Sequence, residues 1–257
     1  MNNLARRVRC AAAVVAALIV VGCAAGMPSI PNTPDDIIKK GDRYYERGRY
    51  FQASELYKAF LARHAGHDRS DYAQFMVAEC LFDDEQYALA AVEYRLLITN
   101  YGYSEYVDDG YFKEALCNYR QSPKPGLDQT KTLEALSQFE QFVRVFGDSP
   151  KVGEAQKYIS EIHEKLAHKD LENAKYYFGR KRYISAIIYL DKIIDNYPDN
   201  SYWVEAKYLK AKALFRRGER FDEALELLNE VIDYPENLRV KRNAEILAGQ
   251  VRGEMNE

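Results

Sequence analysis

Cys23 is the residue whose position in this sequence most directly suggests a chemistry. It follows an apolar run from Cys10 to Val21, which itself follows a start with three arginines and no acid. The run is much shorter than the roughly 20 residues that a membrane-spanning helix needs. A positive start, a short apolar core and a small residue before the cut are the parts of a secretory signal, here cut between Gly22 and Cys23. A thiolate is the strongest side-chain nucleophile for alkyl transfer, so the sequence predicts that Cys23 is modified.

The four residues Val20 to Cys23 resemble the lipobox of bacterial lipoproteins. The resemblance implies a diacylglyceryl thioether on Cys23, removal of residues 1–22 and acylation of the new amino terminus. Several acyl chains anchor a protein stably, whereas one chain is marginal. Ala24 after the cysteine favours sorting to the outer membrane, by analogy with enteric lipoproteins. Two alternatives stay open, an ordinary signal peptide with a cysteine near the cut and a short uncleaved anchor.

The histidines do not have the spacing of a metal site. His163 and His168 are five residues apart, so on a helix they diverge by about 140°, whereas residues four apart share a face. His64 and His67 have only Asp68 beside them. The sequence also has no glycine-rich phosphate loop and no nucleophile elbow. It therefore predicts a binding protein that is not an enzyme and uses no cofactor and no metal.

Two further cysteines, Cys80 and Cys117, lie in the apolar segments VAECLF and EALCNY. A cysteine in such a context usually behaves as a small hydrophobe. A disulfide between them is possible in an oxidising compartment, but nothing in the sequence requires one.

The charge of the chain argues against a nucleic-acid partner. The net charge is −3, and the predicted signal contains three arginines. The body that remains after cleavage is therefore more acidic, the opposite of the basic surface that binds nucleic acid.

An internal repeat governs the predicted fold. In each copy an alanine is followed four residues later by a large side chain, a spacing that puts both on one helix face. The five copies have these residues at Ala53 and Tyr57, Ala90 and Tyr94, Ala135 and Phe139, Ala186 and Leu190, and Ala224 and Leu228. Small residues on the preceding helices mark the expected crossings, at Gly41, Ala78, Ala174 and Ala211. Most tyrosines are then expected to fill gaps between helices rather than to line a ligand site.

This pattern resembles the tetratricopeptide repeat, in five copies from about residue 34 to 235. The sequence predicts an all-α, right-handed superhelix of five tetratricopeptide-like helix pairs with a C-terminal capping helix over 237–257, since a repeat array must protect its last face. The stretch 118–131 is expected to be a loop, and 150–179 a long helix. Cap residues followed by proline, Thr33-Pro34 and Ser149-Pro150, predict two helix starts.

The predicted domains follow from these segments. They are a lipoprotein signal peptide over 1–22, a lipidated flexible linker over 23–33, repeats one to three over 34–148, and repeats four and five with the capping helix over 149–257.

The turns inside the later repeats are basic. They carry Arg180, Lys181, Arg182, Arg216, Arg217 and Arg220. Equivalent turns line up along one edge of a repeat array, so these residues predict a basic edge that binds an acidic surface of a partner. In the alternative interpretation, the cations only complement helix C-termini and stay solvated.

Two stretches carry a family resemblance, LDQTKTLEALSQFEQFVRVFGDSP at 127–150 and KLAHKDLENAKYYFGRKRYISAIIYLDKIIDNYPDNSYWVEA at 165–206. Together with the lipobox and the repeats, they resemble the BamD (YfiO/ComL) family of outer-membrane lipoproteins in the β-barrel assembly machinery. Members commonly have an Asp-containing loop before the third alanine helix, as at Asp128. They also commonly have the pattern seen here at Leu166-Ala167, Asp170, Ala174 and Tyr176-Tyr177.

The resemblance implies a periplasmic scaffold that the lipid on Cys23 anchors to the outer membrane. Its C-terminal repeats would bind the POTRA domains of a BamA-like outer-membrane barrel protein. Its N-terminal repeats would receive unfolded outer-membrane protein substrates, with Tyr44, Tyr45, Tyr72 and Phe75 as expected groove contacts. Two alternatives remain, a periplasmic tetratricopeptide lipoprotein that coordinates cell-wall synthesis or division complexes, and a catalytic lipoprotein, for which no stretch is left to build a second domain.

The chain departs from the family pattern at two turns. Members usually have Tyr-Pro and a small residue where this chain has His64 to Asp68, and Pro where it has Gly102. These turns border the expected substrate pocket, so the family's substrate contacts transfer least well there.

Overall fold

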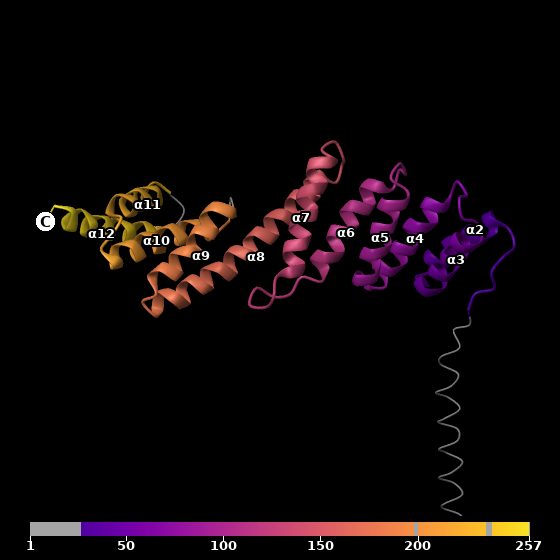
Figure 1. Cartoon of the computed structure of the whole chain (residues 1–257), viewed down its shortest axis with the longest axis horizontal. Helices are drawn as coiled ribbons and strands as arrows, with labels where there is room; N and C mark the ends of the chain where they lie inside the picture. The colour runs from indigo at the N-terminus through magenta and orange to yellow at the C-terminus, as the bar shows by residue number, and fades with distance from the viewer. Residues whose placement is uncertain (1–26, 198–199, 235–237, 257) are drawn as a thin grey trace, which may run out of the picture. The chain divides into compact units, whose positions relative to one another are not determined.

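The computed structural model of this protein describes residues 27–197, 200–234 and 238–256. Over these residues it contains eleven helices and no strand (Figure 1). The first helices of the five pairs are α2 (Pro34–Tyr45), α4 (Ser70–Asp83), α6 (Val107–Arg120), α8 (Val152–Gly179) and α10 (Trp203–Arg217). Their partners are α3 (Tyr50–Arg63), α5 (Tyr87–Asn100), α7 (Thr130–Val145), α9 (Tyr183–Asn196) and α11 (Phe221–Asp233), and α12 (Leu238–Met255) follows.

The helix pairs have the packing that the repeat pattern predicts. The two helices of each pair contact one another. All five motif alanines and their five large partners are fully buried, as are Ala78, Ala174 and Ala211. At the first crossing, a Cβ atom on Gly41 would lie 2.8 Å from Cε1 of the Tyr57 ring. The prediction of five tetratricopeptide-like pairs is therefore confirmed, and the large side chains fill gaps that small residues leave open.

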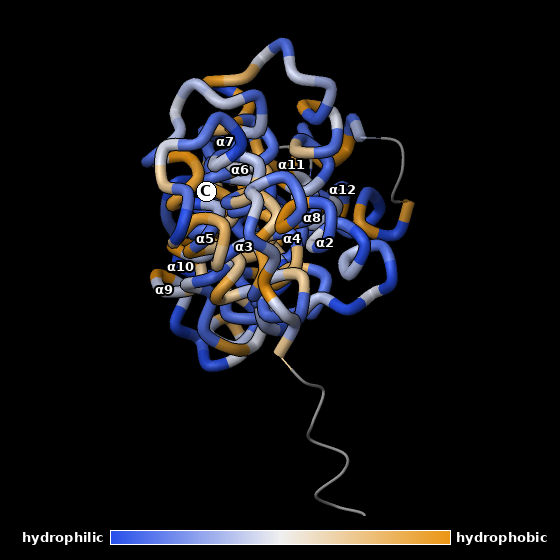
Figure 2. The backbone as a smooth tube through the Cα atoms, turned by 90° about the vertical axis from the view of Figure 1, so that its right-hand side faces the viewer, coloured by the Kyte–Doolittle hydropathy of each residue, from blue (hydrophilic) through white to orange (hydrophobic). Residues whose placement is uncertain are grey.

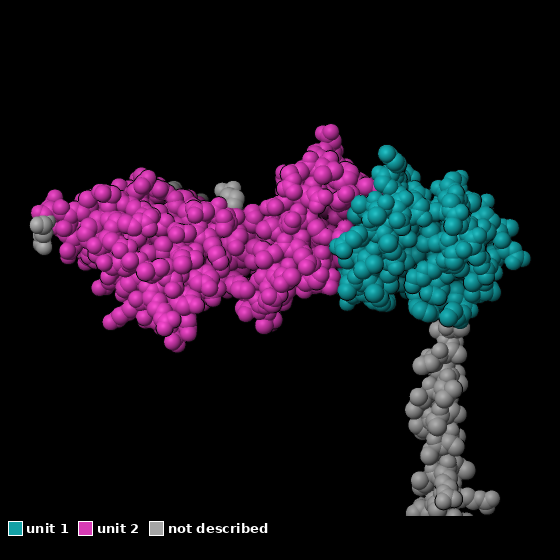
Figure 3. Space-filling view, viewed as in Figure 1, with its two compact units in different colours: residues 1–106 teal, residues 107–257 magenta. Residues whose placement is uncertain are grey.

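The fold divides into two compact units, Met1–Tyr106 and Val107–Glu257 (Figure 3). In the described part of the chain, the first unit contains α2 to α5 and the second contains α6 to α12. The predicted boundary between two domains after residue 148 stays a prediction.

One of the two predicted helix starts is correct. Oγ1 of Thr33 accepts a hydrogen bond from the Asp36 N–H at 3.2 Å, and Pro34 is the first residue of α2. The predicted start at Ser149-Pro150 is wrong, because α8 begins at Val152. The hydroxyl of Ser149 instead donates to a carboxylate oxygen of Asp108 on α6 at 3.0 Å, and residues 149–151 form a turn before the helix.

The third repeat contains a loop that is shorter than predicted. Its limits are 121–129 rather than 118–131, because α6 continues through Arg120 and α7 begins at Thr130. The side-chain amide of Asn118 is buried and donates to Oε1 of Gln138 on α7 at 2.7 Å, which holds the end of α6 in the helix pair. The long helix predicted over 150–179 is confirmed as α8.

The predicted capping helix is confirmed as α12. Ala244, Leu247 and Val251 are buried in one apolar cluster with side chains of α10 and α11, and Val240 packs against that cluster. Apolar and hydrophilic stretches alternate along the tube in Figure 2. Accordingly, within the residues described, no helix combines the length and the apolar character needed to cross a bilayer.

Candidate partner-docking sites

The turn between α8 and α9 presents its cations through an unusual backbone conformation. The backbone N–H groups of Arg180 and Arg182 both donate to the carbonyl oxygen of Tyr177, at 3.1 and 3.0 Å, which closes the turn. Lys181 between them has a φ of 59°, and the equivalent residue of the first repeat, Gly48, has a φ of 67°. The repeat geometry therefore imposes a left-handed residue here, and this chain uses a lysine where glycine is the least strained choice.

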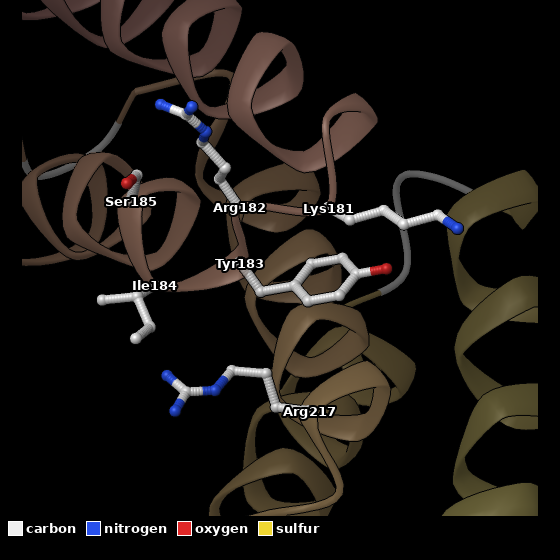
Figure 4. Close-up of a pocket in the computed structure, with 6 residues that line it drawn as sticks. All are labelled: Lys181, Arg182, Tyr183, Ile184, Ser185 and Arg217. Carbon is white, nitrogen blue, oxygen red and sulfur yellow. The ribbon is translucent and has the colours of Figure 1, made fainter.

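Three residues of the predicted basic edge line one open pocket of about 380 Å³ (Figure 4). Lys181 and Arg182 come from the turn of the fourth repeat and Arg217 comes from the end of α10; Tyr183, Ile184 and Ser185 complete the lining. In Figure 4, Arg182 and Arg217 extend on the side of Ile184, whereas Lys181 extends the other way. We call these residues the basic pocket.

The basic pocket has charge that the described residues do not neutralise. Arg217 pairs with Glu219 at 2.9 Å, but no ion pair to a described residue involves Lys181 or Arg182. No acid lines the pocket, and the side chain of Ile184 beside it is exposed. Unpaired cations next to an exposed aliphatic group can bind an acidic surface that also has an apolar part.

The other three predicted cations lie outside the basic pocket. Arg180 lies over the ring of Tyr176, 4.5 Å from its centroid, and Arg220 pairs with Glu223. Arg216 lines a separate groove beside α12. The alternative interpretation, in which the cations only complement the C-terminal ends of helices, also fits Arg216, because this residue is in the last turn of α10.

Two of the four predicted substrate contacts in the first unit share one aromatic cluster. Tyr72 and Phe75 both pack against Tyr106, with ring centroids 5.9 and 4.9 Å apart. Tyr44 instead lies under the guanidinium group of Arg49, and the hydroxyl of Tyr45 donates to Asp83 at 2.5 Å. The structure therefore brings Tyr72 and Phe75 together, and it engages Tyr44 and Tyr45 in other contacts.

Sequence reasoning missed the carboxylates that accept hydrogen bonds from the hydroxyls of buried and half-buried tyrosines. Asp42 accepts hydrogen bonds from Tyr57 at 2.7 Å and from Tyr72 at 2.9 Å, and Glu79 accepts one from Tyr94. Burial and then the bond to Asp42 raise the pKa of Tyr57 and Tyr72, so both stay protonated. The signal was present in the sequence, since Asp42 precedes Tyr57 by 15 residues and Glu79 precedes Tyr94 by the same interval.

The two turns at which the chain departs from the family pattern meet in one pocket. This pocket has a volume of about 300 Å³, and residues of both turns line it, among them His67, Asp68, Gly102 and Tyr103. The ring of Tyr103 is fully exposed.

The histidines of α8 pack separately. His163 faces the ring of Tyr197 and His168 faces that of Tyr202, with centroids 5.8 and 5.4 Å apart. Burial lowers the pKa of His163, which favours its neutral form. In the part of the chain that the structure describes, no group of three or more His, Cys, Asp or Glu side chains is arranged to hold a metal ion.

Cys80 and Cys117 are free thiols, and both are buried. Burial is the main cause that raises the pKa of Cys80 well above its usual value, so the thiol is protonated and unreactive. The disulfide that the sequence left open is absent in this structure.

Cys23 lies outside the described residues, but the segment that follows it can be placed in part. The ammonium group of Lys40 on α2 donates to both the carbonyl oxygen and the hydroxyl of Ser29, each at 2.8 Å. The described end of the predicted linker is therefore held against α2.

The pattern of the family described as outer membrane lipoprotein, YfiO, matches residues 31–226. This chain belongs to the YfiO family. The match spans α2 to α10 and the first part of α11, so it includes four complete helix pairs, part of the fifth, and the basic pocket.

Relatives of this YfiO chain are similar along most of their length. The outer membrane protein assembly factor BamD of Rickettsia prowazekii is 24% identical over 211 residues, covering 79% of this chain and 84% of the relative. The BamD protein of Haemophilus influenzae is 23% identical over 224 residues, covering 83% and 86%. Among solved structures, a TPR repeats protein of Bacteroides fragilis aligns with a TM-score of 0.48 and 13% identity over 87% of this chain and 99% of that one.

Proposed function

We propose that this protein is a lipid-anchored periplasmic scaffold that assists the assembly of proteins into the outer membrane. Membership of the YfiO family is the observation that carries the proposal, and its relatives in two bacteria are named outer membrane protein assembly factors. An array of helix pairs suits the role, because it offers extended surfaces for several partners at once.

The basic pocket is the proposed docking site for the barrel protein of the assembly machinery. A BamA-like partner would place an acidic POTRA surface against Arg182 and Arg217, and an aliphatic side chain against Ile184. Two observations support this role: no described residue forms an ion pair with Lys181 or Arg182, and the side chain of Ile184 is exposed. Charged groups at such a surface mainly accelerate association and fix its register.

Unfolded outer-membrane proteins are the proposed ligands of the first unit. The aromatic cluster around Tyr106 would contact them through the half-buried rings of Tyr72 and Phe75. Aromatic side chains suit such contacts because they bury large apolar areas with little loss of conformational freedom.

The assembly role is tested by a native pull-down of the full-length protein through a C-terminal tag, from detergent-solubilised envelopes of its own host. We expect near-stoichiometric recovery of a POTRA-containing barrel protein. The variant R182E/R217E should lose most of that recovery, whereas the control R220E, on the same edge but outside the pocket, should retain it. Recovery of cell-wall synthases without a barrel protein would overturn the assembly role, and normal recovery with R182E/R217E would overturn only the docking site.

The proposed anchor is tested separately by the variant Cys23→Ala. Without acyl chains on Cys23, only the proposed contact with the barrel protein would hold the protein at the membrane. High salt weakens such a charged contact, so in high salt the variant should move from the membrane pellet to the soluble periplasmic fraction. Persistent membrane attachment of this variant in high salt would contradict a lipid anchor at this residue.

A further inference from the structure

The pocket at the two turns that depart from the family pattern has a lining of polar and aromatic groups. It has a volume of about 300 Å³, and its lining residues are His67, Asp68, Asp71, Asn100, Tyr101, Gly102, Tyr103 and Ser104. All of them belong to the first unit. The lining therefore offers hydrogen-bonding groups and aromatic rings, and it contains no aliphatic side chain. We call it the Tyr103 pocket.

Part of the Tyr103 pocket is a frame that the repeats share. The N–H of Ser104 donates to the carbonyl oxygen of Tyr101 at 2.8 Å, and its hydroxyl donates to a carboxylate oxygen of Asp71 on α4 at 2.6 Å. In the turn after α7, Ser149 makes both bonds in the same way, the second of them to Asp108 at 3.0 Å. Ser104 and Asp71 therefore hold the backbone of the turn rather than wait for a ligand.

Tyr103 is a part of the pocket that this frame does not require. It directly precedes Ser104, and the equivalent position holds Asp148 in the turn after α7 and Gly66 in the turn after α3. The ring of Tyr103 is fully exposed, and Asn100, the last residue of α5, is exposed beside it in the lining. Within the described structure neither side chain forms a hydrogen bond. A large ring and an amide are therefore available to a ligand.

The carboxylate of Asp68 is a third group at the pocket that a ligand can reach. Its side chain is 86% exposed, and its Oδ1 lies 2.5 Å from Nδ1 of His67. The ring of His67 packs edge-on against Phe60, with centroids 5.3 Å apart. The next residue, Arg69, holds its guanidinium group over the ring of Tyr72. This neighbouring cation disfavours a positively charged ligand, so Asp68 is better suited to accept a hydrogen bond from a neutral hydroxyl group.

We propose that the Tyr103 pocket binds an oligosaccharide that carries acetamido groups. A sugar ring has polarised C–H groups on one face, and these would pack on the electron-rich face of the Tyr103 ring. Sugar hydroxyls would donate to Asp68, and an acetamido group would form reciprocal hydrogen bonds with the side-chain amide of Asn100. A peptide with aliphatic side chains would find no aliphatic partner in this lining.

The proposal is tested by isothermal titration calorimetry of the full-length protein, in a detergent without sugar headgroups. The probe is chitotetraose, in which every sugar carries an acetamido group, and the parallel arm is maltotetraose, which has none. We expect a dissociation constant on the order of 1 mM for chitotetraose, because the site is open and buries only part of the ligand. Maltotetraose should bind about fivefold more weakly, because the hydrogen bonds to the amide are lost.

Variants of the two available side chains separate stacking from hydrogen bonding. Tyr103→Ala should weaken binding of chitotetraose about tenfold, whereas Tyr103→Phe keeps the ring and should bind nearly as tightly as the native protein. Asn100→Ala should weaken binding about fivefold. The matched control is Tyr176→Ala, which removes another exposed tyrosine, in the second unit, and should leave the affinity unchanged.

The opposite results are equally clear. No binding of chitotetraose at about 10 mM, equal affinity for maltotetraose, or an equal loss with Tyr176→Ala would each overturn the proposal. A trilysine peptide that binds more tightly than chitotetraose would also overturn it and assign the pocket to basic peptides. This test uses no barrel protein, so its failure is distinct from failure of the proposed assembly role.

Discussion

At the scale of single residues, the contact between Gly41 and Tyr57 determines how closely α2 and α3 approach. Gly41→Ala would place a methyl group 2.8 Å from the Tyr57 ring, which is fully buried and whose hydroxyl donates a hydrogen bond to Asp42. We expect a loss of about 1–3 kcal/mol in the free energy of unfolding, measured by chemical denaturation. The control is Gly249→Ala on α12, where nothing lies within 4 Å and helix propensity should add stability. Equal effects of the two changes would contradict this account.

A second residue, Tyr197, makes the free energy of unfolding depend on pH in the alkaline range. Burial, and then the nearby Asp170 carboxylate, raises the pKa of Tyr197 to about 12. The folded protein therefore keeps this proton longer than the unfolded chain, whose tyrosines titrate near about 10. The resulting stability is complete below pH 10 and is lost as the pH rises to about 12. In Tyr197→Phe the fall in unfolding free energy over this range should be smaller, and the difference from the native protein should be constant from neutral pH to about pH 9.

At the scale of elements, two variants of Lys181, in the turn between α8 and α9, distinguish the effect of its charge on stability from the effect of its backbone conformation. Lys181→Gly removes a cation but suits the φ of 59°, so it should stabilise the protein by about 0.5–1 kcal/mol. Lys181→Ala removes the same charge and keeps the strain, so its unfolding free energy should stay close to that of the native protein. Thermal unfolding of both variants measures the difference, and a Lys181→Gly protein less stable than Lys181→Ala would refute the strain.

The helices also show which features of the fold could be predicted from the sequence and which could not. The alanines and their large partners, such as Ala186 and Leu190, marked all five helix pairs because burial on a helix face imposes a spacing of four. The start of α8 was missed because Ser149 bonds to Asp108, a partner 41 residues away that no local pattern reveals. The sequence analysis also grouped Arg216 with Arg217 because both precede the same turn, although adjacent residues on a helix point about 100° apart and here line different sites.

At the scale of the whole molecule, the two units have separate cores, and this independence can be measured. Leu56→Ala would open a cavity in the first unit and cost about 2–5 kcal/mol there, and Leu228→Ala would do the same in the second. In a repeat array each element depends mainly on its neighbours, so neither change should directly destabilise the unit that does not contain it.

The single tryptophan of the chain, Trp203, reports on the second unit alone. In Leu56→Ala, we expect circular dichroism to show an early transition on denaturation, while the fluorescence transition of Trp203 keeps its native midpoint. In Leu228→Ala the fluorescence midpoint should fall. If the midpoint of the Trp203 fluorescence transition falls equally in both variants, the two units unfold in one cooperative step. A cavity in either core would then destabilise both units.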